Sequence, residues 1–222
     1  MLDWLPPNVS TYGGEIDRFF YVIYYITATV FVLVAAAMVY FLIRYRHKEG
    51  RRAHYTHGSN KLEFLWTSAT TVAMLVLALV SKPVWSDIKQ NIPPTNIQVR
   101  VTGKQFNWEM QYPGPDGMFD TDDDYVIDNQ LHVPEDRVVK LILKSKDVIH
   151  SVFMPDLRFK QDAVPGREIT AWFEATEPGK YEIPCAELCG FGHSGMLGYL
   201  FVHTPEDYEA WVKQTWPEPT EN

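Results

Sequence analysis

The feature that most constrains this chain of 222 residues is an uncharged run of 25 residues from Phe19 to Ile43. As an α-helix the run would be about 37 Å long, which is enough to cross a bilayer with some tilt. A second apolar run extends from Leu62 to Ser81 and is interrupted only by Glu63. We therefore expect transmembrane helices over 19–43 and 62–82.

The segment between the two runs carries the charges that orient them. Residues 44–61 contain six lysines and arginines and a single acid, Glu49. By the positive-inside rule this loop lies in the cytoplasm, so both ends of the chain are expected outside. Residues 1–18 are polar and lack the basic start of a secretory signal, so we expect them to form a retained external tail.

The second apolar run also carries hydroxyl groups, at Thr67, Ser68, Thr70 and Thr71. Small polar side chains favour packing against other membrane helices over contact with lipid. We therefore expect the chain to belong to a larger membrane complex.

Beyond the apolar runs the sequence changes to a pattern of short strands. A linker is expected over 83–94, ending at Pro93-Pro94, and a β domain over 95–204. Apolar and polar residues alternate from Ile97 to Tyr112, and further strands are expected over 125–132, 137–144, 148–153, 167–174, 180–184 and 197–203. Many short strands separated by turns predict an all-β sandwich or barrel. Thr204 is expected to cap a closing helix, so 205–222 is interpreted as a C-terminal helix and tail.

The charge of the chain is unevenly distributed. Residues 83–222 carry 23 acids against 12 lysines and arginines, whereas residues 1–82 carry 5 acids against 8. An acidic external domain argues against nucleic acid and favours a cationic protein partner, although acidity also serves solubility alone.

A loop of twelve residues, from Cys185 to Met196, holds the only two cysteines of the chain. Outside a membrane two cysteines form a disulfide by default, and two buried apolar thiols are the other plain interpretation. His193 and Met196 follow Cys189 at offsets that neither interpretation requires. Zinc would take four strong ligands, whereas copper accepts a weak methionine beside thiolate and imidazole. We therefore favour copper, and two sulfurs are able to bridge a pair of coppers.

A copper pair would take a second histidine, and His150 is the best candidate. It ends the strand-like segment Asp147-Val-Ile-His150, whereas the other histidines lie in the cytoplasmic loop or beside turns: His47, His54, His57, His132 and His203. The alternative is that His150 is only a strand-end histidine whose hydrogen bonds are satisfied.

The loop, the Asp147–His150 segment, Asp162-Ala-Val-Pro-Gly166 and the two-helix anchor resemble subunit 2 of cytochrome c oxidase. The resemblance implies a cupredoxin-type Greek-key barrel after a two-helix transmembrane hairpin. It also implies the roles of six residues. Cys185 and Cys189 would bridge two coppers (the CuA centre), His150 and His193 would bind one copper each, and Met196 and the Glu187 carbonyl would be weak outer ligands. The Glu187 side chain would reach a magnesium ion shared with the catalytic subunit.

The resemblance further implies a function. The chain would accept electrons from a separate c-type cytochrome and pass them to haem in catalytic subunit 1, alongside other oxidase subunits. The oxygen chemistry would lie in that other chain. The sequence of the loop is similar to that of bacterial members of the family. The resemblance therefore implies a bacterial cytoplasmic membrane, with the copper domain on the periplasmic side, rather than the mitochondrial inner membrane.

Two further positions are expected to serve this function. Glu63, in a Glu-x-x-Trp-Thr setting, resembles a residue near the mouth of a proton channel, although it also reads as an interfacial carboxylate. The family segment Gly-x-Gln-Trp-x-Trp, where electrons are accepted, corresponds here to Gly103-Lys-Gln-Phe106-Asn-Trp108. Phe106 replaces the first tryptophan, which puts the route of electrons from the donor in doubt, and Trp108 also fits a core position.

Three alternatives share parts of this pattern. A subunit that feeds a nitric-oxide reductase would look almost identical. A membrane-anchored copper chaperone could use Cys-x-x-x-Cys and a distant histidine, but it would need helices between its strands and one membrane helix. A quinol-oxidising homologue would lack the copper ligands, which are all present here.

Overall fold

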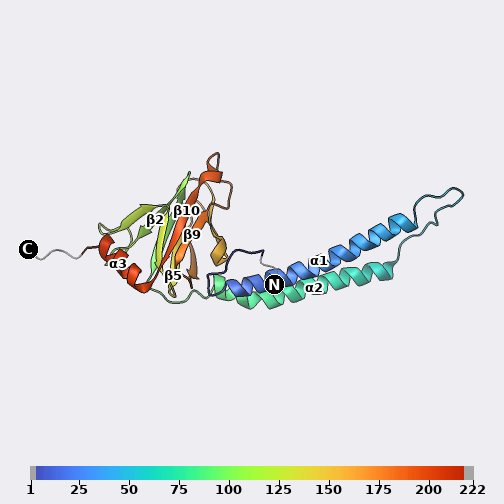
Figure 1. Cartoon of the computed structure of the whole chain (residues 1–222), viewed down its shortest axis with the longest axis horizontal. Helices are drawn as coiled ribbons and strands as arrows, with labels where there is room; N and C mark the ends of the chain where they lie inside the picture. Colours follow the sequence, from blue (N-terminus) through green and yellow to red (C-terminus); the bar gives the residue numbers. More distant parts are fainter. Residues whose placement is uncertain (1–3, 218–222) are drawn as a thin grey trace, which may run out of the picture. The chain divides into compact units, whose positions relative to one another are not determined.

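The computed structural model describes residues 4–217 (Figure 1). The first three residues of the expected tail and residues 218–222 of the expected C-terminal segment lie outside the described part. The chain divides into two compact units: one runs from Glu15 to Asp87, and the other holds the described residues on both sides of it.

The first unit is a pair of long helices. Helix α1 covers Gly13–Arg44 and α2 covers Asn60–Lys89, and both are long and apolar enough to cross a membrane. Helix α2 continues through Pro83, so residues 83–89 of the expected linker are helical. Proline is tolerated in membrane helices because neighbouring groups satisfy the freed carbonyl.

The segment before α1 is shorter than expected and is packed against the β domain. Val9 is 1% exposed and Tyr12 is 8% exposed. Ser10 pairs with Ala175 in an antiparallel bridge, and its Oγ accepts the N–H of Gly13 at 3.1 Å. The capping hydroxyl at Ser10 explains why the helix begins at Gly13 instead of residue 19.

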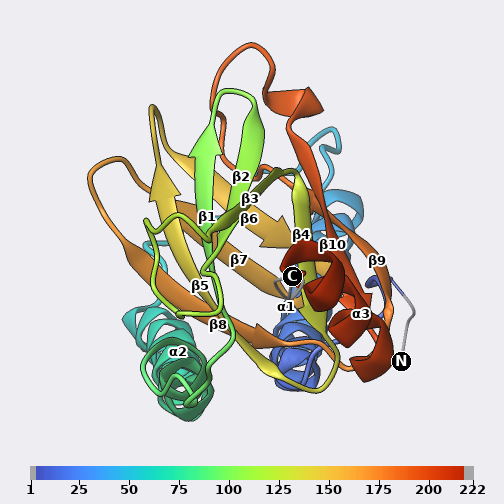
Figure 2. The same cartoon turned by 90° about the vertical axis from the view of Figure 1, so that its left-hand side faces the viewer.

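The second unit is built from ten strands in three sheets (Figure 2). The sheet orders are β3-β2-β1-β5-β8, β4-β10-β9 and β6-β7. The strands are β1 (Gln98–Lys104), β2 (Asn107–Tyr112), β3 (Tyr125–Asp128), β4 (Gln130–Pro134), β5 (Val138–Ser145), β6 (His150–Met154), β7 (Phe159–Ala163), β8 (Ile169–Glu174), β9 (Gly179–Pro184) and β10 (Leu197–His203). Strand β1 runs parallel to β5, and β10 runs parallel to β4.

The core follows from the alternation of apolar residues along these strands. Trp108, Met110 and Tyr112 on β2 point inward with Leu141 on β5 and Leu200 on β10, and all five are buried. Because successive strand residues face opposite sides of a sheet, the same alternation leaves the polar residues outside.

The strand expected over 125–132 is two strands, β3 and β4, which belong to different sheets. The break is at Asn129, which has φ 60°. Its Oδ1 accepts the N–H of Trp108 at 2.9 Å and its N–H donates to the Trp108 carbonyl at 2.7 Å, so Asn129 forms a corner. Asparagine tolerates this left-handed conformation better than other residues with a side chain, and periodicity cannot reveal it.

Strand β7 was not predicted from the sequence. Its residues, Phe159-Lys-Gln-Asp-Ala163, carry apolar side chains only at the two ends. It pairs with β6, and Ala163 lies opposite His150.

Helix α3 (Pro205–Thr215) is capped by Thr204, as predicted, because its Oγ accepts the N–H of Asp207. Trp211 of this helix stacks on the His132 ring at 4.9 Å, and Phe201 stacks on the same ring at 4.7 Å. The Nδ1 of His132 lies 2.8 Å from the Nε2 of His203. The two histidines therefore hold the helix against the sheet, and they contact each other instead of the cysteine loop.

This histidine pair predicts a loss of stability in acid. Burial, and then the charge of His203, lowers the pKa of His132 from 6.5 to about 4. Below pH 6.5, His132 binds a proton in the unfolded chain but stays neutral in the folded chain. The free energy of unfolding is therefore highest above pH 6.5 and decreases as the pH falls toward 4. The loss should reach about 3 kcal/mol for this residue. Thermal unfolding of the full chain in detergent at pH 7 and 4.5 measures it. His132→Gln should flatten the dependence, whereas His57→Gln should not, and equal slopes in both variants would contradict the assignment.

Candidate metal centre

The cysteine loop is closed at its base by the two strands that carry it. Strand β9 ends at Pro184 and β10 begins at Leu197, and these two residues pair across the ladder. The N–H of Cys185 donates to the carbonyl of Met196 at 3.1 Å. The first and last residues of the loop are therefore held side by side.

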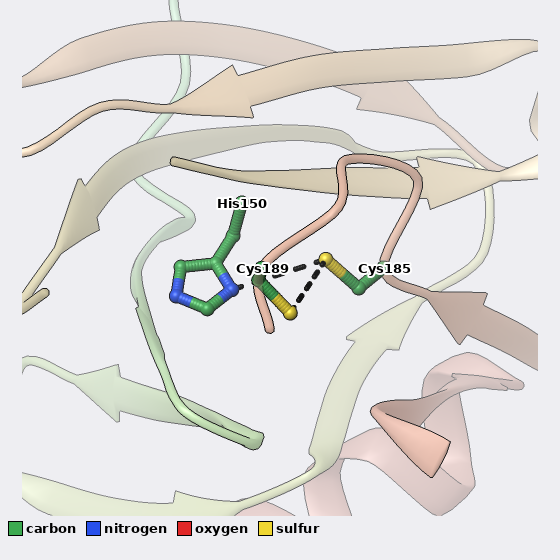
Figure 3. Close-up of side chains that lie close together, drawn as sticks. All are labelled: His150, Cys185 and Cys189. Carbon is green, nitrogen blue, oxygen red and sulfur yellow. Dashed lines mark hydrogen bonds between the residues drawn. The ribbon is translucent and has the colours of Figure 1, made fainter. Parts of the chain in front are cut away.

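Two thiols and an imidazole meet inside this loop (Figure 3). The Sγ atoms of Cys185 and Cys189 are 3.9 Å apart, and the Nδ1 of His150 is 3.8 Å from the Sγ of Cys185. Candidate ligand atoms of the three residues all lie within 4.8 Å of one another. Both cysteines are free, and their separation is far longer than the disulfide bond of about 2 Å.

The second half of the loop adds two more donors. The Nδ1 of His193 is 3.6 Å from the Sγ of Cys189, and the Sδ of Met196 is 3.8 Å from the same sulfur. The carbonyl of Glu187 lies 3.3 Å from the Sγ of Cys185. The structure thus brings all six of the predicted ligand residues together, although nothing about their spacing in sequence requires His150 to be among them.

The surroundings of His150 fix how its ring can be used. It is fully buried, and its Nε2 lies 2.7 Å from Oδ1 of Asp147. A carboxylate accepts the proton of Nε2, which leaves the lone pair on Nδ1, the nitrogen that faces the cysteine sulfur. Burial of Asp147 opposes its ionisation, but the hydrogen bond from His150 and those from the Gln105 and Val148 N–H groups outweigh it and lower the pKa of this carboxyl.

Two glycines allow the protein to close around these residues. A Cβ at Gly103 would lie 2.8 Å from the His150 ring. A Cβ at Gly192 would lie 2.5 Å from the Phe106 ring. Neither distance is possible for a real side chain, so strand β1 and the Phe106 ring pack directly on the site because these positions are glycine.

The donor set fits a soft metal. The described site offers two thiols, two imidazole nitrogens and a thioether, and four of the five residues are buried: His150, Cys185, Cys189 and Met196. A thioether is a poor zinc ligand, whereas copper accepts a weak methionine beside thiolate and imidazole. The set therefore suits copper better than zinc.

The remaining predicted residues lie in different places. Phe106 is 38% exposed and covers the loop at Gly190 and Gly192. Trp108 is fully buried, edge-on to His150 at 5.8 Å, and its Nε1 donates to the carbonyl of Ile183. Glu63 lies in the first turn of α2, in the helical unit.

Sequence reasoning gave no role to two residues that touch the site. Asp147 contacts His150, and the side chain of Gln105 donates to the carbonyl of Cys189. In the sequence, Asp147 lies three positions before His150 in the segment Asp147-Val-Ile-His150. Its spacing is the one signal in the sequence. Gln105 belongs to the family segment at Gly103–Trp108, but that segment gives no indication of a contact with Cys189.

Fold and site together define a membrane-anchored protein with a cupredoxin-like domain that carries a centre for a soft metal. Residues 97–200 match the family model described as cytochrome C oxidase subunit II, periplasmic domain. Residues 4–84 match the model for the transmembrane domain of the same subunit. The chain therefore belongs to the cytochrome c oxidase subunit II family, whose members are subunits of an oxidoreductase complex.

Individual relatives agree with this assignment. The chain is 33% identical to the alternative cytochrome c oxidase subunit 2 of Bradyrhizobium diazoefficiens, over 95% of this chain and 83% of the relative. It is 31% identical to cytochrome c oxidase subunit 2 of Synechocystis, over 98% of this chain and 77% of the relative. Among solved structures, the periplasmic domain of subunit II of cytochrome oxidase from Bradyrhizobium japonicum superposes with a TM-score of 0.50 at 28% identity, covering 56% of this chain and 96% of that one.

The buried thiol gives a prediction for the metal-free protein. Burial, and then the neighbouring Cys185 sulfur, raises the pKa of the Cys189 thiol above its usual value. Alkylation requires the thiolate, so the pH of half-maximal Cys189 alkylation should lie well above the value of about 8.5 of an ordinary cysteine. Mass spectrometry of the digested protein measures the modification at Cys189, with the same chain unfolded in urea as the control. Equal pH profiles in the folded and unfolded chains would contradict the prediction.

Proposed function

We propose that this chain is the electron-accepting subunit of a haem–copper terminal oxidase. It accepts electrons from a c-type cytochrome at a dinuclear copper centre and passes them to haem in the catalytic subunit. The observation that carries the proposal is the meeting of two free thiols, two imidazoles and a thioether within successive distances of 3.6 to 3.9 Å. The family assignment supports the same oxidase role.

Each donor has a role in this proposal. Cys185 and Cys189 would hold the copper pair as shared thiolate ligands, His150 and His193 would each supply an imidazole nitrogen, and Met196 and the Glu187 carbonyl would be weak outer ligands. When bound, such a copper pair holds one electron shared between both metals, which changes each metal–ligand bond little. The protein donors occupy the positions around the metals, so the site transfers electrons without binding a substrate.

The chain itself supplies rigidity and exclusion of water. The hydrogen bond between Cys185 and Met196 holds the ends of the loop, and Asp147 holds the His150 ring. Burial of Cys189 and Met196 keeps water from the sulfurs. A site that moves little between redox states exchanges electrons with less reorganisation.

The first test is electron paramagnetic resonance of the oxidised full chain loaded with copper. Hyperfine splitting from two equivalent coppers is expected. Cys189→Ser should abolish this signal while the far-ultraviolet circular dichroism of the β domain is unchanged, because one bridging sulfur is lost. Ser194→Ala, in the same loop, is the matched control and should keep the signal. A one-copper pattern in the unaltered chain, or two-copper splitting that persists in Cys189→Ser, would overturn the assignment.

We also propose where the donor makes contact. Phe106 is partly exposed beside the loop, and Phe191 at the loop tip is fully exposed. Two lysines nearby, Lys104 on β1 and Lys146 just after β5, are paired with Glu109, at 2.9 and 2.8 Å. Apolar contact at the loop therefore supplements the attraction of a basic cytochrome c to the acidic domain. Trp108, which is buried against His150, would contribute from inside the domain.

Phe191→Ser tests this contact. The side chain makes no buried contact, so its loss should leave the copper spectrum unchanged and lower the second-order rate of electron transfer from cytochrome c about tenfold, as for a removed apolar anchor. Stopped-flow oxidation of the cytochrome by the assembled oxidase measures the rate. The control is Met118→Ser, which removes another exposed apolar side chain from a different loop. Equal rates in the two variants would refute the contact.

Two further roles and an orientation in the membrane belong to the same proposal. Glu63 serves a proton path at the cytoplasmic end of α2, and the exposed side chain of Glu187 reaches a magnesium ion shared with the catalytic subunit. The basic loop lies in the cytoplasm and the copper domain on the periplasmic side of a bacterial membrane.

Of the alternatives, a nitric-oxide reductase would use this chain in the same way. A chaperone of the thioredoxin type is not favoured, because residues 98–203 carry no α-helix between strands.

A further inference from the structure

The turn between β1 and β2 contacts the metal centre from outside the cysteine loop. At this turn the side-chain Nε2 of Gln105 donates to the carbonyl of Cys189. The backbone N–H of the same residue donates to Oδ2 of Asp147 at 2.7 Å. Gln105 is thus hydrogen-bonded both to a cysteine of the centre and to the carboxylate that holds a histidine of the centre.

Asp147 completes the connection. Its Oδ1 lies 2.7 Å from the Nε2 of His150 and 2.7 Å from the N–H of Val148. The segment before it is also held to strand β1, because the N–H of Lys146 donates to the carbonyl of Gly103 at 2.9 Å. A continuous path of hydrogen bonds therefore runs from His150 through Asp147 and Gln105 to Cys189.

We propose that Asp147 and Gln105 are positioning residues that fix His150 and Cys189 relative to each other in the metal centre. Asp147 sets the ring orientation and tautomer of His150, and Gln105 sets the carbonyl, and with it the backbone, of Cys189. This inference rests on the proposed function, because it assigns roles toward the copper centre. Neither residue contributes a ligand atom; they act through the ligands.

The physical effect of each residue is distinct. The carboxylate of Asp147 places a negative charge on the far side of the His150 ring, which stabilises the oxidised, more positive state of a bound metal. Gln105 carries no charge, so it acts through geometry alone. Partners that orient metal ligands typically change metal affinity by about 10- to 100-fold when they are removed.

Two variants separate these effects. Asp147→Asn removes the charge and turns a donor toward the N–H of Gln105, so the oxidised-to-reduced ratio at a given potential should fall about tenfold, which is a rise of about 59 mV for one electron. Gln105→Leu keeps the volume and loses only the bond to Cys189, so it should change the copper hyperfine splitting and weaken copper binding, with little change in potential. Asp128→Asn is the control, because it removes the same charge from an ion pair with Lys104 and touches no ligand.

The experiment uses the full chain in detergent loaded with copper. Spectroelectrochemistry gives the potential, paramagnetic resonance gives the splitting, and competition with a copper chelator gives the affinity. If the unaltered chain lacks two-copper splitting, the proposed function fails. If it has the splitting but Asp147→Asn and Gln105→Leu match Asp128→Asn in all three measurements, the positioning roles are wrong. Should Asp147→Asn not fold, as judged by circular dichroism of the metal-free chain, Gln105→Leu decides alone.

Discussion

The metal centre depends on one backbone hydrogen bond, from the N–H of Cys185 to the carbonyl of Met196. Without it the first and last residues of the twelve-residue loop would not be held side by side. With it the loop ends are fixed by the ladder of β9 and β10, so the entropy of ordering the donors is lost when the barrel folds and not when a metal binds. The barrel therefore serves as the rigid support for the site, and the hydrogen bonds of Asp147 and Gln105 add to it.

The donors were predictable to different degrees for a physical reason. Cys185, Cys189, His193 and Met196 are close in sequence, and a short loop forces close residues together. His150 is 35 positions from Cys185, and only the chemistry of a second histidine and a family resemblance pointed to it. Gln105 was not predictable, because its role depends on the approach of the β1–β2 turn to the loop. That approach depends on Gly190 and Gly192, where a Cβ would lie 2.6 Å from the Nε2 of Gln105 and 2.5 Å from the Phe106 ring, and sequence periodicity carries no such information.

The fold, like the donors, was predictable only in part. Long apolar runs and strict alternation predicted the helices and most strands, because burial is averaged over many residues. The errors occurred where a single residue decides the outcome. Asn129 breaks one predicted strand by adopting a positive φ and bonding to Trp108 through its side chain. Strand β7 has too few apolar residues to show a period, and it forms only because β6 offers it a partner.

The packing of the N-terminal segment on the β domain has a consequence for how the protein is made. Ser10 precedes the first helix, yet it pairs with Ala175, which follows the second. The two partners can meet only if the chain crosses the membrane an even number of times between them. If the N-terminus lay on the other side of the membrane, the carbonyl of Glu174 and the N–H of Thr176 would lose their backbone partners, Thr11 and Val9. The pairing at the end of β8 therefore forms only in a chain inserted with both segments on the same side, and backbone groups left unpaired beside an edge strand favour aggregation.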